Sequence, residues 1–288
     1  RQEEEDKVDK ITSTFFNIMK PKVGDRRIMG LCIIIPGIID AENKRILSTV
    51  IGVGYSDPVV QRFEEAFHDY PFCLLNDTAC FAYAEYVFAN ITEPNFAYIN
   101  VSKGVGACLF ANGKMLRGAG SNATQFGHFS VDRNGPLCAC GNHGCVERVV
   151  GENALTERAE ACGIDLTRFA GRKPLYCDIG AMAEDGDAHA KELIKDLAVD
   201  LSFAISNLIT LFNPSLVVIG GMGVNLGPFF LSNIRDEVQN SGFKEFVSNT
   251  WIQYSTLGLD SELGGAARYY IDHYYDFFEQ MQGGLYAD

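Results

Sequence analysis

One stretch of the chain combines metal-binding residue types with tight turns. Between His128 and Glu147 it holds three cysteines, Cys138, Cys140 and Cys145, among glycines and other turn formers. Three thiolates and one neutral imidazole form a ligand set that structural Zn²⁺ prefers, and glycine allows the backbone to fold closely around an ion. We therefore predict a closed zinc site at His128, Cys138, Cys140 and Cys145, which fixes loop geometry and performs no chemistry. The alternative is a set of reduced thiols in a turn.

A second candidate site lies where a short apolar segment, 72–75, meets a helical segment at Asn76 and Asp77. In α/β proteins, polar groups at such a junction face a cleft. Asp77 could accept a proton from, or hydrogen-bond to, a ligand hydroxyl while Asn76 orients it. Alternatively, Asp77 caps the following helix through Thr78. Position alone leaves both interpretations open.

Glycine-rich loops are further candidates, because a phosphate can be held by the backbone of such a turn. The segments 102–106 and 220–223 each follow a predicted strand, but Gly-x-Gly is a weak motif and a plain hairpin is the alternative for 102–106. A third glycine-rich loop, 118–121, leads into Gln125. The glycines concerned in the first two loops are Gly104, Gly106, Gly220 and Gly221.

The elements that must position these residues alternate between helix and strand. Apolar residues at helical spacing predict a helix over 3–19, and Asn112-Gly113 predicts a type I′ hairpin turn. The expected strands are 28–35, 72–75, 96–101, 106–111, 114–117 and 216–219, and the other expected helices are 57–68, 78–89, 153–162, 178–184, 187–212 and 264–282.

The change from helix-linked strands to a meander suggests two lobes. We expect an N-terminal α/β lobe at 1–95, on which the terminal helical segment 272–288 packs back. The C-terminal α/β lobe would span 96–271 and contain the zinc segment.

Composition excludes several classes of protein. The 288 residues include 24 Lys and Arg against 37 Asp and Glu, giving a net charge of −13 that disfavours nucleic acid, because such binding relies on basic side chains neutralising phosphates. There is no apolar run of membrane-spanning length, so no membrane partner is expected. Six of the nine cysteines lie in apolar or helical contexts, and no signal peptide is found at Arg1, which favours a reducing cytoplasm.

Taken in order, these segments resemble the ROK family of repressors, open reading frames and sugar kinases. The strongest match is His128 followed by Cys-x-Cys-Gly-x-x-Gly-Cys-x-Glu, from Cys138 to Glu147, and the resemblance extends over nearly the whole chain. Pro36-Gly37, Asn76-Asp77 and the glycine and alanine residues of 257–267 support it.

The resemblance implies an actin-like (ribonuclease-H-like) ATPase fold, with two α/β lobes around a sugar-binding cleft. The zinc would hold His128 and Glu147 in place behind the sugar. By the same resemblance, a hexose or amino-hexose would contact Gly37, Asn76, Asp77, Gln125, His128 and Glu147.

Three departures separate the chain from the family's kinases. Gln125 stands where the kinases carry Glu, and Lys103 interrupts their Gly-Thr-Gly phosphate turn. The Asp-x-Gly-x-Thr phosphate loop, expected before the helix at 3–19, is missing. Asp178-Ile179-Gly180 has the first letters of this motif, but it is expected to open a helix and not to form the phosphate loop. The glycines of the loops 102–106 and 220–223 are therefore expected to be vestigial nucleotide-binding positions.

Regulators of the NagC, Mlc and XylR type keep the sugar pocket and the zinc segment while their phosphate loops decay. We therefore expect the sugar-sensing effector domain of a ROK-type transcriptional regulator, which forms a dimer or tetramer. It would bind DNA only through an N-terminal helix-turn-helix domain, which we expect to be absent from these residues. The alternative is an ATP-dependent sugar kinase of the glucokinase or N-acetylhexosamine kinase type, with Mg²⁺ and with Asp77 as general base.

Overall fold

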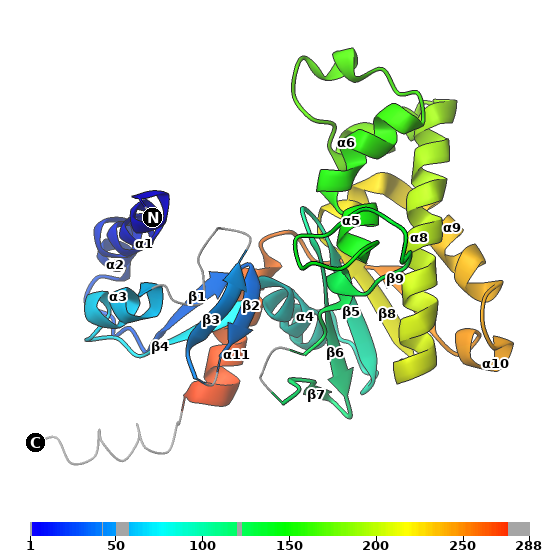
Figure 1. Ribbon diagram of the computed structural model, residues 1–288. Helices are drawn as coiled ribbons and strands as arrows, with labels where there is room; N and C mark the ends of the chain where they lie inside the picture. The colour runs from blue at the N-terminus through cyan, green and yellow to red at the C-terminus, as the bar shows by residue number, and fades with distance from the viewer. Residues whose placement is uncertain (1, 42, 50–57, 120–122, 276–288) are drawn as a thin grey trace, which may run out of the picture. The chain divides into compact units, whose positions relative to one another are not determined.

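The computed structural model describes residues 2–41, 43–49, 58–119 and 123–275, which form two compact units (Figure 1). Unit 1 comprises Arg1–Phe88, Gly118–Asn122 and Asp260–Asp288, and unit 2 comprises Ala89–Arg117 and Ala123–Leu259. The lobe boundaries predicted from sequence, 95/96 and 271/272, lie close to these divisions and remain a prediction.

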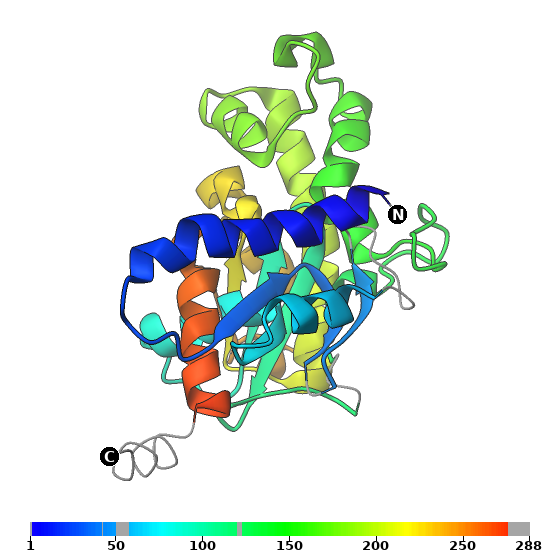
Figure 2. The ribbon, with the colours of Figure 1, turned by 90° about the vertical axis from the view of Figure 1, so that its left-hand side faces the viewer.

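Unit 1 begins with a long helical stretch, seen across the front of Figure 2. It consists of α1 (Gln2–Thr14), a π-helical turn (Phe15–Met19) and α2 (Lys20–Val23), so the predicted helix over 3–19 is confirmed and continues further. Its buried Phe15 packs edge-on against Phe67, just after α3 (Val59–Ala66), with ring centroids 5.3 Å apart. This contact joins the helical stretch to the core of unit 1.

Two pairs of strands follow in unit 1. Parallel strands β1 (Leu31–Ile35) and β4 (Phe72–Asn76) are paired so that Ile35 lies opposite Asn76. Antiparallel strands β2 (Gly37–Asp40) and β3 (Arg45–Thr49) form a hairpin that the sequence analysis did not predict. Because β1 leads directly into Gly37 and β4 into Asp77, the two candidate ligand-binding segments start at one edge of the β1–β4 pair.

Helices α4 (Asp77–Phe88) and α11 (Ser261–Tyr274) pack against each other in unit 1. They approach so closely that a Cβ on Gly265 would lie 2.0 Å from the carbonyl oxygen of Cys80. The bounds predicted for the helix over 264–282 were wrong at both ends. The observed helix α11 begins at Ser261 and ends at Tyr274, and Tyr275 has an extended backbone. The rest of that prediction, and of the segment 272–288, lies outside the described residues after 275.

Unit 2 is built on a five-stranded sheet in the order β7-β6-β5-β8-β9. The parallel strands β5 (Phe96–Val101) and β8 (Leu216–Gly220) are buried along their whole length, as central strands covered on both faces should be. The remaining strands are β6 (Val105–Ala111), β7 (Lys114–Met115) and β9 (Trp251–Tyr254). Positive φ angles at Asn112 (53°) and Gly113 (72°) confirm the hairpin turn between β6 and β7.

Helices complete unit 2, and the long α8 (Ala188–Phe212) lies alongside the sheet, with α9 (Gly227–Gln239) beside it (Figure 1). Asp178 accepts a hydrogen bond from the backbone of Leu175 (2.8 Å), which confirms that it opens a helix. The other helices are α5 (Val146–Val150), α6 (Glu152–Ala161), α7 (Tyr176–Glu184), α10 (Lys244–Val247), and short 3₁₀ turns at Phe126–His128, Leu166–Phe169 and Met222–Leu226. Of the helices in the described ranges, none has both the length and the apolar character that a bilayer crossing requires.

Candidate metal and ligand-binding site

The four predicted metal ligands come together in unit 2. The ligand atoms of His128, Cys138, Cys140 and Cys145 all lie within 4.8 Å of one another. The Sγ atoms of Cys140 and Cys145 are 3.6 Å apart, and Cys138 Sγ is 3.6 Å from His128 Nδ1. A tetrahedral zinc site with Zn–S bonds of about 2.3 Å places two sulfurs about 3.8 Å apart, and a sulfur and a nitrogen about 3.6 Å apart. The cluster therefore has the donors and the spacing to hold a metal ion.

Backbone turns hold these ligands in place. The N–H of Cys138 donates to the carbonyl of Asn142 (2.8 Å), which closes the loop that carries Cys138 and Cys140. Gly144 has φ +60°, and a Cβ there would lie 1.8 Å from the carbonyl oxygen of Asp132. Only glycine fits this position without moving the backbone. Gly144, one of the glycines that marked the segment in the sequence, is thus needed for the turn that positions Cys145.

Two cysteines of the cluster differ in the acidity of their thiols. Burial raises the pKa of the Cys145 thiol to about 12, whereas the backbone N–H of Asn142 lowers the pKa of Cys140. Metals bind the thiolate form of cysteine. A divalent ion would therefore supply the positive charge that a buried Cys145 thiolate requires.

Glu147 lies on the first turn of α5, immediately after the last cysteine of the cluster. Its Oε2 accepts a hydrogen bond from the backbone N–H of Val105 (3.3 Å), at the start of β6. A Cβ on Gly104 would lie only 2.4 Å from the same Oε2. The turn between β5 and β6 is a hairpin, closed by a hydrogen bond from Ser102 N to the Gly104 carbonyl (2.9 Å), and it packs against Glu147.

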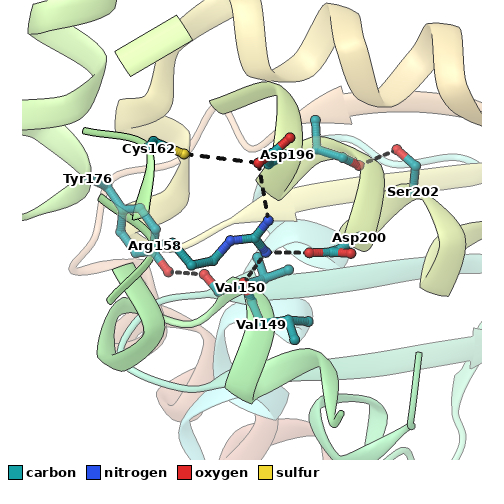
Figure 3. Close-up of polar contacts among 9 residues, drawn as sticks. Val149, Val150, Arg158, Cys162, Tyr176, Asp196, Asp200 and Ser202 are labelled. Atoms are coloured by element: carbon teal, nitrogen blue, oxygen red, sulfur yellow. Dashed lines mark hydrogen bonds and ion pairs between the residues drawn. The ribbon is translucent and has the colours of Figure 1, made fainter. Parts of the chain in front are cut away.

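Two side chains from other helices fix the end of α5 (Figure 3). Tyr176 donates its hydroxyl hydrogen to the carbonyl of Val150 (2.7 Å), and Arg158 donates to the carbonyl of Val149 (2.8 Å). Arg158 also pairs with Asp200 on α8. Because the last carbonyls of a helix lack partners within it, these contacts hold the short helix that carries Glu147. The sequence analysis missed this arrangement.

The other predicted glycines gather at the carboxyl ends of the central strands. Gly106 on β6 and Gly220 on β8 both lie opposite Asn100 of β5. Gly221 has φ +78°, and a Cβ there would lie 2.1 Å from Asn100 Oδ1. Beside them, the Ser102 hydroxyl accepts from the backbone N–H of Met222 (3.2 Å). The role of these glycines as vestigial nucleotide-binding positions remains a prediction.

The second candidate site is in unit 1, at the carboxyl ends of β1 and β4. One side-chain amide, Nδ2 of Asn76, donates both to the carbonyl of Gly37 (2.7 Å) and to Asp77 Oδ1 (3.0 Å). Asn76 Oδ1 accepts from the N–H of Ala79 (3.0 Å), so Asn76 caps α4. Asp77 Oδ1 also accepts from the backbone of Thr78 (2.8 Å). Asn76 thus orients Asp77, and both roles considered for Asp77 fit this geometry.

Burial shapes the acidity of this site. It raises the pKa of Asp77, although the hydrogen bonds from Thr78 and Asn76 act in the opposite direction. Glu262, on the first turn of α11, also has a raised pKa, chiefly from burial and then from the negative charges of Asp260 and Asp77. Its Oε2 is buried and accepts no hydrogen bond within the described residues. Sequence analysis did not find Glu262, because a single Glu at a helix start carries no specific signal.

The remaining predicted ligand-binding residue, Gln125, precedes the 3₁₀ turn that carries His128. Its carbonyl accepts from the backbone N–H of His128 (3.0 Å). Gly37, Asn76 and Asp77 thus belong to unit 1, whereas Gln125, His128 and Glu147 belong to unit 2.

Comparison with known proteins identifies the class to which this fold and these residues belong. A family model described as ROK family matches residues 2–272. The chain therefore belongs to the ROK family.

Two relatives are regulators by name. The chain is 26% identical over 250 residues to the xylose repressor of Bacillus subtilis (strain 168), an alignment that covers 86% of the chain and 62% of the repressor. It is 28% identical over 249 residues to the DNA-binding transcriptional dual regulator NagC of Escherichia coli (strain K12), covering 84% of the chain and 60% of NagC. The chain thus spans about three fifths of the length of these relatives.

Solved structures include both branches of the family. A ROK family transcriptional regulator, a homolog of the E. coli MLC protein, superposes with a TM-score of 0.77 at 24% identity, over 91% of this chain and 67% of its own. A ROK family glucokinase from Streptomyces griseus, in complex with glucose and AMPPNP, gives 0.74 at 23% identity, over 91% and 87%. These likenesses establish the α/β fold shared by ROK regulators and sugar kinases, the actin-like ATPase fold.

Proposed function

We propose that this chain is the sugar-sensing effector domain of a ROK-type transcriptional regulator and that it binds a hexose, pentose or amino-hexose. The observation that carries the proposal is the arrangement at the carboxyl ends of β1 and β4, where one amide of Asn76 contacts both Gly37 and Asp77. A fixed carboxylate beside a half-buried backbone turn suits a ligand with several hydroxyl groups. The names of the two relatives, a xylose repressor and NagC, support a regulator.

The proposed sugar contacts are the residues that the sequence motifs indicated. Asp77 accepts a hydrogen bond from a sugar hydroxyl, oriented by Asn76. In unit 2 the proposed contacts are Gln125, His128 and Glu147. Nδ1 of His128 is directed at Cys138, so its other ring nitrogen, Nε2, is the atom proposed to contact the sugar.

The metal in this proposal is one structural Zn²⁺ held by His128, Cys138, Cys140 and Cys145. Four protein ligands satisfy zinc without a water molecule, so the ion supplies rigidity. Glu147 follows Cys145 by two residues, so a bound ion would also restrict the backbone that carries this proposed sugar contact.

A kinase is the alternative, and the hairpin after β5 argues against it. Phosphoryl transfer depends on groups that hold the nucleotide phosphates and Mg²⁺. In this chain the hairpin turn packs on Glu147 and carries Lys103, whose long side chain occupies a position where the family's kinases have a small residue. The kinase alternative is supported by the shared fold of the ROK family glucokinase. In a kinase, Asp77 would be the general base, and ATP and Mg²⁺ would be required.

The wider setting follows from the relatives. We propose a cytoplasmic regulator that assembles as a dimer or tetramer and reaches DNA through a helix-turn-helix domain outside these 288 residues. The net charge of −13 supports assigning DNA binding to a separate domain.

A thermal-shift panel tests the sugar proposal directly. It would contain xylose, glucose, N-acetylglucosamine, N-acetylmannosamine and their phosphates, because a ligand at about a hundred times its Kd stabilises a protein by roughly 2.7 kcal/mol. We expect one sugar class to raise the melting temperature in a concentration-dependent way, and Asp77→Ala to abolish that rise. A panel without any shift at millimolar concentrations would contradict the proposal.

A further inference from the structure

A pair of cysteines in unit 1 has no part in the proposed function. Cys32 on β1 lies directly opposite Cys73 on the neighbouring parallel strand β4. Their sulfurs are 3.7 Å apart, with the Cys73 thiol donating to Cys32. Cys32 in turn donates to the backbone carbonyl of Ala266 on α11 (3.3 Å). Both side chains therefore project from the same face of the strand pair.

The spacing of the strands suits a covalent bond between these two residues. Neighbouring strands lie about 4.7–4.9 Å apart, and a disulfide joins residues whose Cα atoms are about 4.4–6.8 Å apart. Rotation of the two side chains can therefore bring the sulfurs into bonding distance while the strands stay in register. Cysteines whose Cβ atoms diverge could not do this without backbone movement.

The two thiols differ in accessibility and acidity. Cys32 is half-buried, whereas Cys73 is 1% exposed. The hydrogen bond from Cys73 lowers the pKa of Cys32, and the same bond raises the pKa of Cys73. The thiolate is the form of cysteine that attacks an oxidant. Cys32 is therefore the thiol that reacts first, and Cys73 is placed to react second.

We propose that Cys32 and Cys73 form a reversible redox site, in which a hydroperoxide converts the dithiol into a disulfide. The Cys32 thiolate attacks the peroxide oxygen, which gives a sulfenic acid at Cys32 and releases an alcohol or water. The Cys73 sulfur then attacks the Cys32 sulfur, forming the S–S bond and expelling the sulfenic oxygen as water. The two sulfurs together lose two electrons, which the peroxide accepts.

Other cysteines of the chain provide contrasts. Cys177 on α7 is exposed, and no second cysteine faces it at disulfide distance among the described contacts. Cys108 on β6 is buried, and burial raises its pKa to about 12, so it is shielded from oxidants. Cys80 on α4 lies close enough to Cys73 to raise its pKa. Cys80 is therefore the cysteine that competes with Cys32 for a disulfide with Cys73.

The disulfide would tie together strands that carry the proposed ligand contacts. β1 leads into Gly37, and β4 ends at Asn76, three residues beyond Cys73. A cross-link between residues 41 positions apart also restricts the unfolded chain. We therefore expect the oxidised protein to melt at a higher temperature than the reduced protein.

The test is peptide mapping of the zinc-loaded chain after treatment with limiting hydrogen peroxide. Free thiols are alkylated, the protein is digested without reductant, and cross-linked peptides are identified by mass spectrometry. We expect a Cys32–Cys73 peptide that disappears after dithiothreitol, and an unchanged result in Cys177→Ser. In Cys73→Ser, we expect dimedone to trap a sulfenic acid at Cys32.

Two results would overturn the proposal. One is alkylation of both Cys32 and Cys73 under conditions that fully oxidise Cys177. The other is a disulfide that joins Cys73 to Cys80 in place of Cys32. Both results come from the wild-type protein, so the test stands even if a serine variant fails to fold.

Discussion

At the scale of single residues, the chemistry of this chain depends on how two short segments hold a carboxylate. Asp77 is oriented by the amide of Asn76, and Glu147 is oriented by the N–H of Val105. Both lie on the first turn of a helix, Asp77 on α4 and Glu147 on α5, and both are fixed by hydrogen bonds. A carboxylate held in this way loses little entropy when a sugar hydroxyl binds to it.

The buried position of Asp77 predicts a pH dependence for sugar binding. Its pKa is raised by burial, so protonation begins at a higher pH than for an ordinary aspartate. The ionised form is the stronger acceptor for a sugar hydroxyl. Binding should therefore weaken as the pH falls through this raised pKa and be fully present above it. Titrations of the sugar at several pH values would measure the midpoint.

Glu262 allows a further test of that pH profile, since it is the neighbouring carboxyl whose pKa is raised by burial and by the negative charges of Asp260 and Asp77. Glu262→Gln removes one of the two acids without touching the Asn76 contact. We expect the midpoint for binding to shift toward lower pH in this variant, because a repulsive charge is lost. A pH profile unchanged in Asp77→Asn would contradict the assignment of the transition to Asp77.

The cysteine cluster yields a second prediction at this scale. Cys140→Ser should reduce the zinc content of purified protein from about one ion per chain and should lower the melting temperature, because binding energy at a structural site contributes to folding. Metal analysis of chelator-free protein measures the first effect. Cys177→Ser, which changes an exposed thiol outside the cluster, should change neither quantity. Wild-type protein purified without any zinc would refute the metal assignment.

At the scale of elements, the close crossing of α4 and α11 organises unit 1. Gly265 faces the backbone of α4, where an added Cβ would lie 2.0 Å from the Cys80 carbonyl oxygen and 2.9 Å from the nitrogen of Ala84. Neither atom can move without distorting the helix. This crossing sets the distance between the first turns of both helices, which carry Asp77 and Glu262.

We expect Gly265→Ala to lower the free energy of unfolding by about 1–3 kcal/mol, the range for an overpacked contact. Gly258→Ala is the matched control, since a Cβ there meets nothing within 4 Å, and it should change stability by less than about 0.5 kcal/mol. Urea denaturation of the three proteins gives both values. Equal stability of the two variants would show that the helices separate easily at this point.

Elements with local sequence signals could be predicted, and those that depend on distant partners could not. The four residues of the His/Cys cluster lie within 18 consecutive positions, from His128 to Cys145, so their spacing alone indicated the cluster. β9 is a four-residue edge strand that pairs with β8, which ends at Gly220, 31 positions before β9 begins, and it was missed. The hairpin of β2 and β3 was missed as well.

The site shows the same limit. Arg158 and Asp200 are 42 residues apart in the chain, and their pairing depends on how α6 packs against α8. The pair Cys32 and Cys73 depends on the register of two strands. Resemblance to a family supplied the expected sugar contacts, but neither of these arrangements follows from a motif. They follow from packing, which one sequence does not reveal.

At the scale of the whole molecule, the chain has the fold of proteins that phosphorylate sugars and of proteins that sense them. Nearly all of the catalysis in phosphoryl transfer comes from positioning the nucleotide and its Mg²⁺. We propose that the chain belongs to the sensing branch, because its hairpin at Ser102–Gly104 carries Lys103 and packs on Glu147.

We therefore predict that the natural full-length protein binds sugar without phosphorylating it. A coupled assay with ATP, Mg²⁺ and each sugar that gave a thermal shift should show no sugar-dependent ADP release. A ROK kinase assayed in parallel provides the positive control. Turnover of about one per second or faster, abolished by Asp77→Asn, would make Asp77 a general base and the protein an enzyme.

The most direct test of the sugar-binding claim is a calorimetric titration of the best sugar from the panel into wild type and Asp77→Ala. The account predicts saturable binding to wild type and a loss of about 1.5–3 kcal/mol in the variant, the range for hydrogen bonds to charged groups. Asp69→Ala, which changes an exposed carboxylate that lies 3.3 Å from the ring of His68, should bind like wild type. Undiminished binding by Asp77→Ala, accompanied by a loss of about 1 kcal/mol in stability, would show that Asp77 only supports its helix and would contradict the account.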